Sequence, residues 1–312
     1  MPITESITES IMESFMQPPR IGIIGGSGLS SLTALRDARR VDVDSGFGRP
    51  SSTVVVGRLF GADVAFLSRH GDDHKVAPAR VNARANIDAL KRVGCTQILS
   101  LSAVGSLRKE LPPGHFVLID QFIDRTHGRP QTFFEDGVVA HVGFADPVCT
   151  RLRAAATKAC VDQAIPHTSG GTYVVMNGPQ FSTRAESALH RSWGAQVIGM
   201  TALPEAKLAR EAEMCFLTIA MPTDYDCWNE DHGAVTAEVV ASVMRDNRNR
   251  ALALLEAILP GLGASQGPCG HGCDRALDGA IMTSVRAVIE HDDPRTRHLL
   301  TRWLAAQQAP RG

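Results

Sequence analysis

Short apolar runs alternate with helical stretches along most of this chain, and the alternation constrains its fold more than any other feature of the sequence. Four of the runs are rich in Ile, Val and Leu and have the length of buried strands; they lie at residues 21–24, 97–102, 172–176 and 214–221. Intervening stretches carry apolar side chains at helical spacing and include residues 79–92, 147–163, 183–193 and 237–259. Strands that alternate with helices predict an α/β fold with a mostly parallel central sheet flanked by helices.

The pattern also predicts a single domain, because no internal repeat and no linker interrupts the chain before Pro260. Its main body is expected to span residues 20–260. Residues 1–19 end in Gln-Pro-Pro and are expected to form a mobile N-terminal arm. Residues 261–272 are rich in glycine and predict a break before a short helical tail. We therefore expect residues 261–312 to form a helical extension that packs on the same domain.

Composition excludes several classes of protein. The formal net charge is −1, which argues against a dedicated nucleic-acid or membrane-surface partner. No apolar run approaches the roughly 20 residues that a membrane-spanning helix needs. The 7 cysteines are odd in number and widely scattered, and no secretory signal is evident, so a reducing, cytoplasmic location is expected.

Two acidic residues, Asp224 and Asp226, directly follow the apolar run at residues 214–221. Carboxylates at the end of a buried strand are costly to desolvate without partners. They suit a ligand that offers hydrogen-bond donors, and a purine with a ring nitrogen to protonate and an exocyclic amino group is one such ligand. The alternative is that the two acids cap a helix or pair with arginine.

Small hydroxyls, glycines and one arginine follow four other predicted strands. These segments are Gly25-Gly26-Ser27-Gly28, Ser68-Arg69-His70-Gly71, Ser102-Ala103-Val104-Gly105-Ser106 and the position of Thr201. Glycine lets backbone N–H groups approach an anion, arginine offers a planar fork of donors, and histidine adds a further donor. Each segment alone is also compatible with an ordinary turn or a surface side chain. Together they predict a phosphate pocket at the carboxyl ends of the strands.

Two other patterns invite a metal, and neither is complete. His70 and His74 have i, i+4 spacing, but no third ligand supports them and Gly71 opposes a helix. Cys269 and Cys273 enclose one histidine without a second cluster nearby in the sequence, so a flexible loop is the preferred interpretation. The sequence therefore predicts no metal. It also lacks the G-x-S-x-G elbow of a serine hydrolase.

Taken together, these segments resemble the S-methyl-5′-thioadenosine phosphorylases, a branch of the trimeric purine nucleoside phosphorylases. The similar stretches run in order from residue 21 to residue 259 and read IGIIGGSGL, SRHG, NARANI, SAVGSL, IDQFIDRTHGRPQTFF, NGPQFSTRAES, GMTALPEA and MPTDYDCW. The resemblance implies a twisted, partly closed sheet, with residues 20–260 as the catalytic domain. It also implies a homotrimer or a dimer of trimers, with active sites near subunit interfaces.

The resemblance assigns roles to individual residues. Those matching the phosphate contacts are Ser27, Arg69, His70, Thr201 and, through its backbone amide, Ala103. Those matching the nucleoside contacts are Phe181 at the rings, Met200 under the ribose, His141 near the 5′ substituent, and Ser182, Asp224 and Asp226 at the base. Asn177 and Gln180 depart from the animal enzymes' version of their loop.

The implied reaction is phosphorolysis of S-methyl-5′-thioadenosine to adenine and 5-methylthioribose 1-phosphate, in purine and methionine salvage. Phosphate is a co-substrate, and no cofactor is expected. Asp224 is the candidate general acid toward the imidazole-ring nitrogen of the leaving purine, and Asp226 can accept from the 6-amino group. Two aspartates favour a 6-aminopurine, since the branches that use 6-oxopurines place asparagine at the acid position.

Three alternatives stay open. The first is a broader purine nucleoside phosphorylase that also acts on adenosine or methylthioinosine. The second is a dinucleotide-binding oxidoreductase built on the glycines after residue 24, although a clean G-x-G-x-x-G is missing. The third is an inactive family member that serves as a scaffold, against which the intact Arg69, His70 and Asp224 argue.

Overall fold

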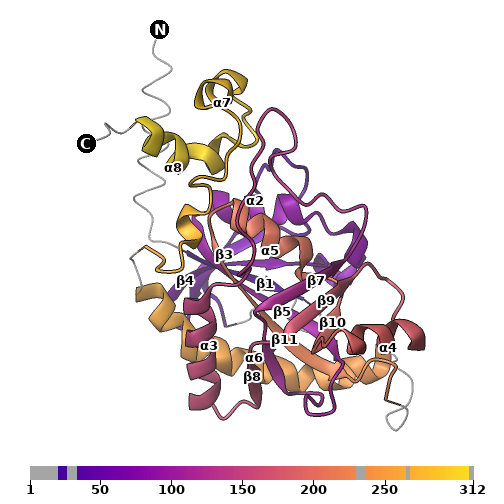
Figure 1. Cartoon of the computed structure of the whole chain (residues 1–312). Coiled ribbons are helices and arrows are strands. Elements are labelled where there is room, and N and C mark those ends of the chain that lie inside the picture. Colours follow the sequence, from indigo (N-terminus) through magenta and orange to yellow (C-terminus); the bar gives the residue numbers. More distant parts are fainter. Residues whose placement is uncertain (1–19, 27–33, 230–236, 265–267, 309–312) are drawn as a thin grey trace.

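A computed structural model describes residues 20–26, 34–229, 237–264 and 268–308 of the chain (Figure 1). The predicted N-terminal arm at residues 1–19 lies outside the described residues, and so does Ser27. Within the described part, no helix is both long enough and apolar enough to cross a membrane.

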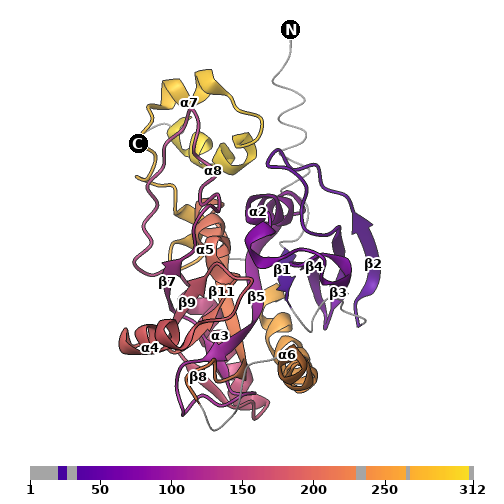
Figure 2. The same ribbon diagram turned by 90° about the vertical axis from the view of Figure 1, so that its right-hand side faces the viewer.

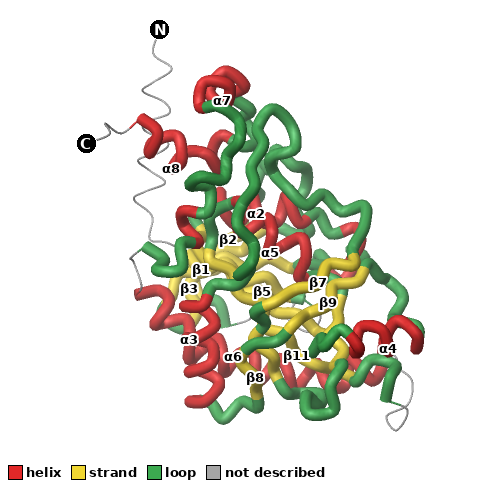
Figure 3. Tube along the Cα trace, in the orientation of Figure 1, coloured by secondary structure: helices red, strands yellow, loops and turns green. Residues whose placement is uncertain are grey.

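The strands form one 11-stranded mixed sheet in the middle of the molecule (Figure 3). Six of the ten strand pairings in the described chain are parallel. The strands are β1 (Arg20–Gly25), β2 (Arg36–Val41), β3 (Val54–Leu59), β4 (Ala62–Ser68), β5 (Cys95–Ser106), β6 (Phe116–Leu118), β7 (Gln121–Arg125), β8 (His167–Ser169), β9 (Thr172–Met176), β10 (Val197–Gly199) and β11 (Cys215–Asp224).

The sheet branches at β5. Its main path runs β2-β3-β4-β1-β5-β10-β9-β7, while β11, β6 and β8 leave this path at β5. Near the end of β5, Gly105 pairs with Asp224 of β11 on one edge and with Ile198 of β10 on the other. This arrangement confirms the predicted α/β fold with a mostly parallel, partly closed sheet. It also brings the carboxyl ends of β1, β4, β5 and β11 to one edge, since these strands are parallel neighbours.

Helices cover both faces of the sheet (Figure 2). They are α2 (Ala83–Arg92), α3 (Thr150–Asp162), α4 (Arg184–Ser192), α5 (Ala202–Glu211), α6 (Ala237–Ala264), α7 (Val285–His291) and α8 (Arg297–Gln308). Helices α2 and α5 pack on each other, and so do α3 and α6. Each pair buries its apolar stripe in a different cluster: Leu90 and Leu208 belong to one, and Leu152 and Leu255 to the other. The sheet therefore has a buried apolar core on both faces.

Helix α2 begins later than its apolar spacing predicts. The helix expected from residue 79 starts at Ala83. The reason is the preceding residue, Asn82, whose side-chain oxygen accepts a hydrogen bond from the backbone N–H of Ala85 (3.1 Å). Such a cap satisfies a donor that the helix itself leaves free, and it fixes the first turn.

Helix α6 ends later than predicted. The break expected from residue 261 is wrong at its start, because the helix continues through Pro260 to Ala264. Leu262 is buried against the core, and its carbonyl accepts a hydrogen bond from Nε2 of Gln97 (3.2 Å). Packing and this hydrogen bond support a last turn that the glycines alone would disfavour.

The C-terminal extension packs on the body of the molecule. Leu299, Leu300 and Trp303 of α8 are buried in the same apolar cluster as α2 and α5. Arg302 donates to both carboxylate oxygens of Glu213, each at 2.7 Å. The backbone N–H of Leu277 donates to the same carboxylate (3.0 Å). Two points of the extension are thus held by one buried acid just before β11.

Candidate active site

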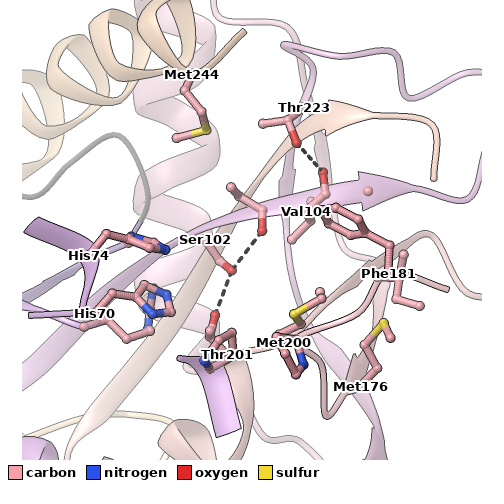
Figure 4. Close-up of a pocket in the computed structure, with 18 of the residues that line it drawn as sticks. His70, His74, Ser102, Val104, Met176, Phe181, Met200, Thr201, Thr223 and Met244 are labelled. Carbon is pink, nitrogen blue, oxygen red and sulfur yellow. Dashed lines mark hydrogen bonds between the residues drawn. The ribbon is translucent and has the colours of Figure 1, made fainter. Parts of the chain in front are cut away.

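A cavity of about 880 Å³ opens where the carboxyl ends of the parallel strands meet (Figure 4). Nine of the eleven predicted site residues line it, namely Arg69, His70, Ala103, Phe181, Ser182, Met200, Thr201, Asp224 and Asp226. They come from the ends of β4, β5, β10 and β11 and from the loop before α4. Segments far apart in the sequence therefore meet at the edge expected for an open α/β sheet.

Arg69 is held by a buried network. Its Nε and Nη2 donate to the two carboxylate oxygens of Glu205 (2.6 and 3.0 Å), Nη2 also donates to Oγ of Ser100 (2.7 Å), and Nη1 donates to the carbonyl of Leu101 (2.9 Å). A guanidinium has five N–H donors, so one on Nη1 is left over by these four bonds. A Cβ on Gly26 would lie 2.7 Å from Nη1, so only glycine fits at this position, where the chain after β1 passes close to the guanidinium.

His70 carries its proton on Nδ1, because this atom lies 2.8 Å from the carbonyl oxygen of Val76, which can only accept. Burial, followed by the charge of Arg69, lowers the pKa of His70 to about 4. At neutral pH the ring is therefore uncharged and Nε2 is an acceptor. The further donor expected from the sequence would require a second proton. His74 stacks on this ring, with 4.3 Å between the centroids.

Thr201 stands at the N-terminus of α5. Its Oγ1 lies 3.1 Å from Oγ of Ser102 (Figure 4). The Ser102 oxygen in turn lies 3.1 Å from the hydroxyl of Tyr173. Burial raises the pKa of Tyr173, so its hydroxyl stays protonated. The backbone of Leu203 is not helical, so α5 offers no regular N-terminal turn beside Thr201. This side of the cavity thus combines hydroxyls with one arginine N–H.

Asp224 is the last residue of β11 and lines the same cavity. Its Oδ2 accepts a hydrogen bond from Oγ1 of Thr223 (2.8 Å), and its Oδ1 accepts one from the backbone N–H of Asp226 (2.8 Å). Burial raises the pKa of Asp224 above its usual range. A raised pKa favours the protonated carboxyl, which is the form that can donate a proton.

Asp226 is 5% exposed, and its backbone has a φ of 52°, in the left-handed region. Burial also raises the pKa of Asp226. Its Oδ2 is buried without a hydrogen-bond partner among the described residues. A buried acceptor of this kind is costly unless a ligand satisfies it. Asp226 is therefore placed to accept a hydrogen bond from whatever fills the cavity.

The rim is apolar. Phe181 is 51% exposed although it lines the cavity, and such an exposed ring is available to cover a planar ligand. Met200 lies so close to Gly178 that a side chain there would collide with its sulfur. The carbonyl of Met200 accepts from Nη1 of Arg129 (2.8 Å), which fixes the backbone under the cavity.

His141 is the one described site residue that does not line the cavity of its own chain. It is exposed, and its backbone N–H donates to the carbonyl of Ala280 (2.8 Å). Next to it, Ala140 forms a β-bridge with Ile281. The segment that carries His141 is thus attached to the C-terminal extension.

Sequence reasoning missed several residues of the site. Glu205 is fully buried and orients Arg69; its place in the first turn of α5, among small apolar residues, was the available signal. Met244, Arg245 and Arg248 of α6 also line the cavity. Their spacing puts them on one side of a helix, but nothing in the sequence indicates which face that side meets.

The fold and this site are those of a nucleoside-processing enzyme family, and the chain belongs to the phosphorylase superfamily, whose family model matches residues 20–260. The family predicted from the sequence is thereby confirmed.

Individual relatives are more specific. The chain is 52% identical over 265 residues to an S-methyl-5′-thioadenosine phosphorylase of Rhodospirillum rubrum, covering 85% of this chain and 90% of the relative. It is 47% identical to one of Gloeobacter violaceus, covering 92% of this chain and 96% of the relative. A methylthioadenosine phosphorylase from an antarctic soil metagenomic library superimposes with a TM-score of 0.85 and 41% identity, over 91% of this chain and 100% of that one.

A more distant structure carries a ligand. The methylthioadenosine phosphorylase of Schistosoma mansoni in complex with adenine superimposes with a TM-score of 0.80 at 33% identity, over 85% of this chain and 99% of that one.

Proposed function

We propose that this chain catalyses the phosphorolysis of S-methyl-5′-thioadenosine to adenine and 5-methylthioribose 1-phosphate. The observation that carries the proposal is that one cavity is lined both by an anion-binding group of residues and by two carboxyls, one half-buried and one buried. The first group includes Arg69 and Thr201, and the second is Asp224 and Asp226. The substrate named for the relatives matches this pairing of phosphate and 6-aminopurine chemistry.

At the base, Asp224 donates its proton to the imidazole-ring nitrogen of the purine as the glycosidic bond breaks. Its raised pKa supports this role, because burial favours the protonated form of the carboxyl. Oδ2 of Asp226, which has no partner in the described part of the chain, accepts from the 6-amino group. Ser182 lies beside the pair, and Phe181 and Met200 cover the nucleoside from the rim.

At the other side, phosphate receives the remaining N–H of Arg69, the hydroxyl of Thr201 and the backbone amide of Ala103, with Ser27 as a further predicted contact. Neutral His70 accepts a hydrogen bond from a phosphate hydroxyl through Nε2. Because protein groups already hold Arg69 in place, little side-chain freedom is lost when phosphate binds. Phosphate then attacks the sugar carbon that the base leaves.

The proposal includes the assembly. A homotrimer or a dimer of trimers would bring His141, which does not line its own cavity, to the 5′ side of a neighbouring copy's site. The exposed Phe181 at the rim and Val139 beside His141 are apolar surfaces that such a contact would cover. The reaction itself uses phosphate as its co-substrate and needs no cofactor.

Product analysis tests the function. Methylthioadenosine should yield adenine and methylthioribose 1-phosphate in phosphate buffer, with arsenate as the only effective replacement. Equal adenine release without phosphate would make the protein a hydrolase and contradict the proposal. Rates on adenosine and methylthioinosine, measured in the same assay, decide how broad the specificity is. An adenosine/methylthioadenosine phosphorylase is known from Schistosoma mansoni, at 33% identity to this chain.

A further inference from the structure

Four buried cysteines meet at the opposite end of β11 from the cavity. They are Cys149, Cys215, Cys269 and Cys273, and their sulfur atoms all lie within 4.8 Å of one another. Cys215 is the first residue of β11, whereas Asp224 is the last. Nine residue steps separate the two ends, roughly 30 Å along a strand. The cluster therefore belongs to neither the phosphate side nor the base side of the proposed active site.

Three separate segments supply the sulfurs. Cys149 precedes the first turn of α3, Cys215 opens β11, and Cys269 and Cys273 lie in the C-terminal extension. The extension segment was interpreted from the sequence as a flexible loop, an interpretation that does not account for the burial of both its thiols at 4% and 1% exposure. The sequence could not show the cluster, because its members meet only through the tertiary fold.

The spacing of the sulfurs suits a tetrahedral metal. The Sγ atoms of Cys149 and Cys269 are 3.7 Å apart. Zinc–sulfur bonds of about 2.3 Å place two sulfurs of a tetrahedral site about 3.8 Å apart. A disulfide would need them at about 2.05 Å. All four cysteines are free thiols in the structure.

The backbone around the sulfurs is fixed independently of any ion. Gly272 has a φ of 72°, and its N–H donates to the carbonyl of Cys269 (2.8 Å), closing a tight turn between the two extension cysteines. The N–H of Cys269 donates to Oδ2 of Asp274 (3.1 Å). On the body, the N–H of Cys149 donates to the carbonyl of Phe216 (3.0 Å). These bonds hold the ligands in the manner of the outer shell of a metal site.

A compensating charge is also present. Four thiolates around a divalent cation carry a net charge of −2, which is costly in a buried site. Arg151 lies beside the cluster, and its Nη2 donates to Sγ of Cys215 (3.5 Å) and to Oε1 of Gln97 (3.0 Å). The sulfur of Cys149 lies at the N-terminus of α3, where the helix dipole favours negative charge.

Buried cysteine by itself indicates little, because a thiol packs like a small apolar side chain. Two other buried cysteines of the same chain can be compared with the cluster. Cys95 and Cys160 are also buried, and neither belongs to the cluster. Burial raises the pKa of Cys160 to about 11, so that thiol stays neutral in its apolar surroundings. Convergence of four sulfurs from three segments, beside an arginine, distinguishes the cluster from these two.

We propose that Cys149, Cys215, Cys269 and Cys273 bind one structural zinc ion. Binding exchanges four thiol protons for Zn²⁺, forming four Zn–S bonds without any change of oxidation state. All four positions of the tetrahedron are filled by protein, so the ion has no open position for a substrate and takes no part in catalysis. It joins the start of the C-terminal extension to α3 and β11. The expectation of no metal is revised accordingly, and the proposal stands independently of the proposed reaction.

Metal analysis of the full chain tests this. Protein purified under reducing conditions without added chelator should contain about one zinc ion per chain by elemental analysis. The variants Cys269→Ser and Cys273→Ser should lose most of it, while Cys160→Ser should retain it. A thiol-blocking reagent should release zinc in proportion to the thiols consumed, which separates cluster-bound zinc from zinc adsorbed elsewhere.

Cobalt gives a readout that does not depend on the variants folding. Wild-type protein with Co²⁺ in place of zinc should show thiolate-to-cobalt charge transfer and the intense d–d bands of a tetrahedral sulfur site. Metal-free protein with four free thiols would overturn the proposal, as would disulfides that remove four titratable thiols from native protein. Equal zinc in Cys273→Ser and wild type, or iron in place of zinc, would overturn it too.

Discussion

Helix α5 and strand β11 follow one another in the chain and run between two different regions of the molecule. The polar side chains at the cavity end have another role than those where α5 leads into β11. At the cavity end, Thr201 and Asp224 line open space, and Oδ2 of Asp226 has no hydrogen-bond partner among the described residues. At the other end, where α5 runs into β11, two buried acids each hold another segment of the protein. Glu211 accepts from Oγ1 of Thr132 and the N–H of Phe133, both at 2.7 Å.

The same packed end includes Glu213, which holds Arg302 and Leu277, and Cys215 in the thiol cluster. The difference shows that burial of polar groups serves two purposes in one short piece of chain. Near the cavity it leaves hydrogen-bonding capacity for a ligand, and at the packed end the protein satisfies that capacity itself. Substitutions at the two ends should therefore change different measurements.

The largest effect is expected from Asp224→Asn. Loss of the proton donor should lower kcat on methylthioadenosine by about two to four orders of magnitude, the range typical of a lost general acid. The relative rate on methylthioinosine should rise, because an amide can pair with both the 6-oxo group and the neighbouring ring N–H. Asp226→Asn is the matched control and should cost less. An unchanged substrate ratio together with a lowered melting temperature would show that the acid only shapes the turn.

The second prediction concerns Glu205→Ala, which removes the partner of a buried cation. Unfolding free energy should fall by about 3–5 kcal/mol, since Arg69 would keep its charge without its carboxylate. Misplacement of Arg69 should also raise KM for phosphate more than KM for methylthioadenosine. Denaturant unfolding and steady-state kinetics measure the two effects. Equal changes in both KM values would show that Glu205 has no specific effect on phosphate binding.

The third prediction tests the packed end through pH. Burial raises the pKa of Glu211 from its usual value of 4.5 to about 7. The folded state then binds more protons than the unfolded state between these values, so this group makes stability fall as pH rises through that window, by about 2 kcal/mol between pH 5 and pH 8. His70 acts in the opposite direction, because its pKa of about 4 in the fold lies below its usual 6.5.

The variant Glu211→Gln removes the titrating carboxyl and leaves His70 in place, so it separates their contributions to the pH dependence of stability. The amide can still accept a hydrogen bond from the N–H of Phe133 and donate one to Thr132. Wild-type minus variant unfolding free energy, measured in urea at several pH values, should decline from pH 5 to pH 8. A flat difference would contradict a raised pKa. Activity at permissive temperature should stay near that of the wild type, unlike that of the variants at the cavity end.

The smallest effect is expected at the rim. Thr183 caps α4: its hydroxyl accepts from the N–H of Glu186 (3.2 Å), and the Glu186 carboxylate accepts from the N–H of Thr183 (2.8 Å). Thr183→Ala should cost about 1 kcal/mol of stability. It should raise KM for the nucleoside slightly, because Phe181 and Ser182 precede the cap. An unchanged KM with lowered stability would show that the cap stabilises the helix and does not affect nucleoside binding.

The sequence was sufficient for the elements and for most of the cavity. Strand runs and the glycine, hydroxyl and arginine segments that follow them are local patterns, and the parallel sheet gathers their ends automatically. It was insufficient where a contact joins distant segments through packing. Arg69 meets Glu205 across 136 residues, and Cys149 meets Cys269 across 120. Helix α6 passes its glycines only because Leu262 is buried, a tertiary effect that local propensity does not contain.

The doubly paired end of β5 has a consequence for anyone who would redirect this protein to a new nucleoside. Gly105 has strands on both edges, and a Cβ there would lie 3.0 Å from Oδ1 of Asp224 and 3.3 Å from a methyl carbon of Ile198. A larger side chain at position 105, on the floor of the cavity, therefore has no space. Phe181 and Met244 are better positions for a mutagenesis library, because their side chains line the same cavity and neither residue lies in a strand.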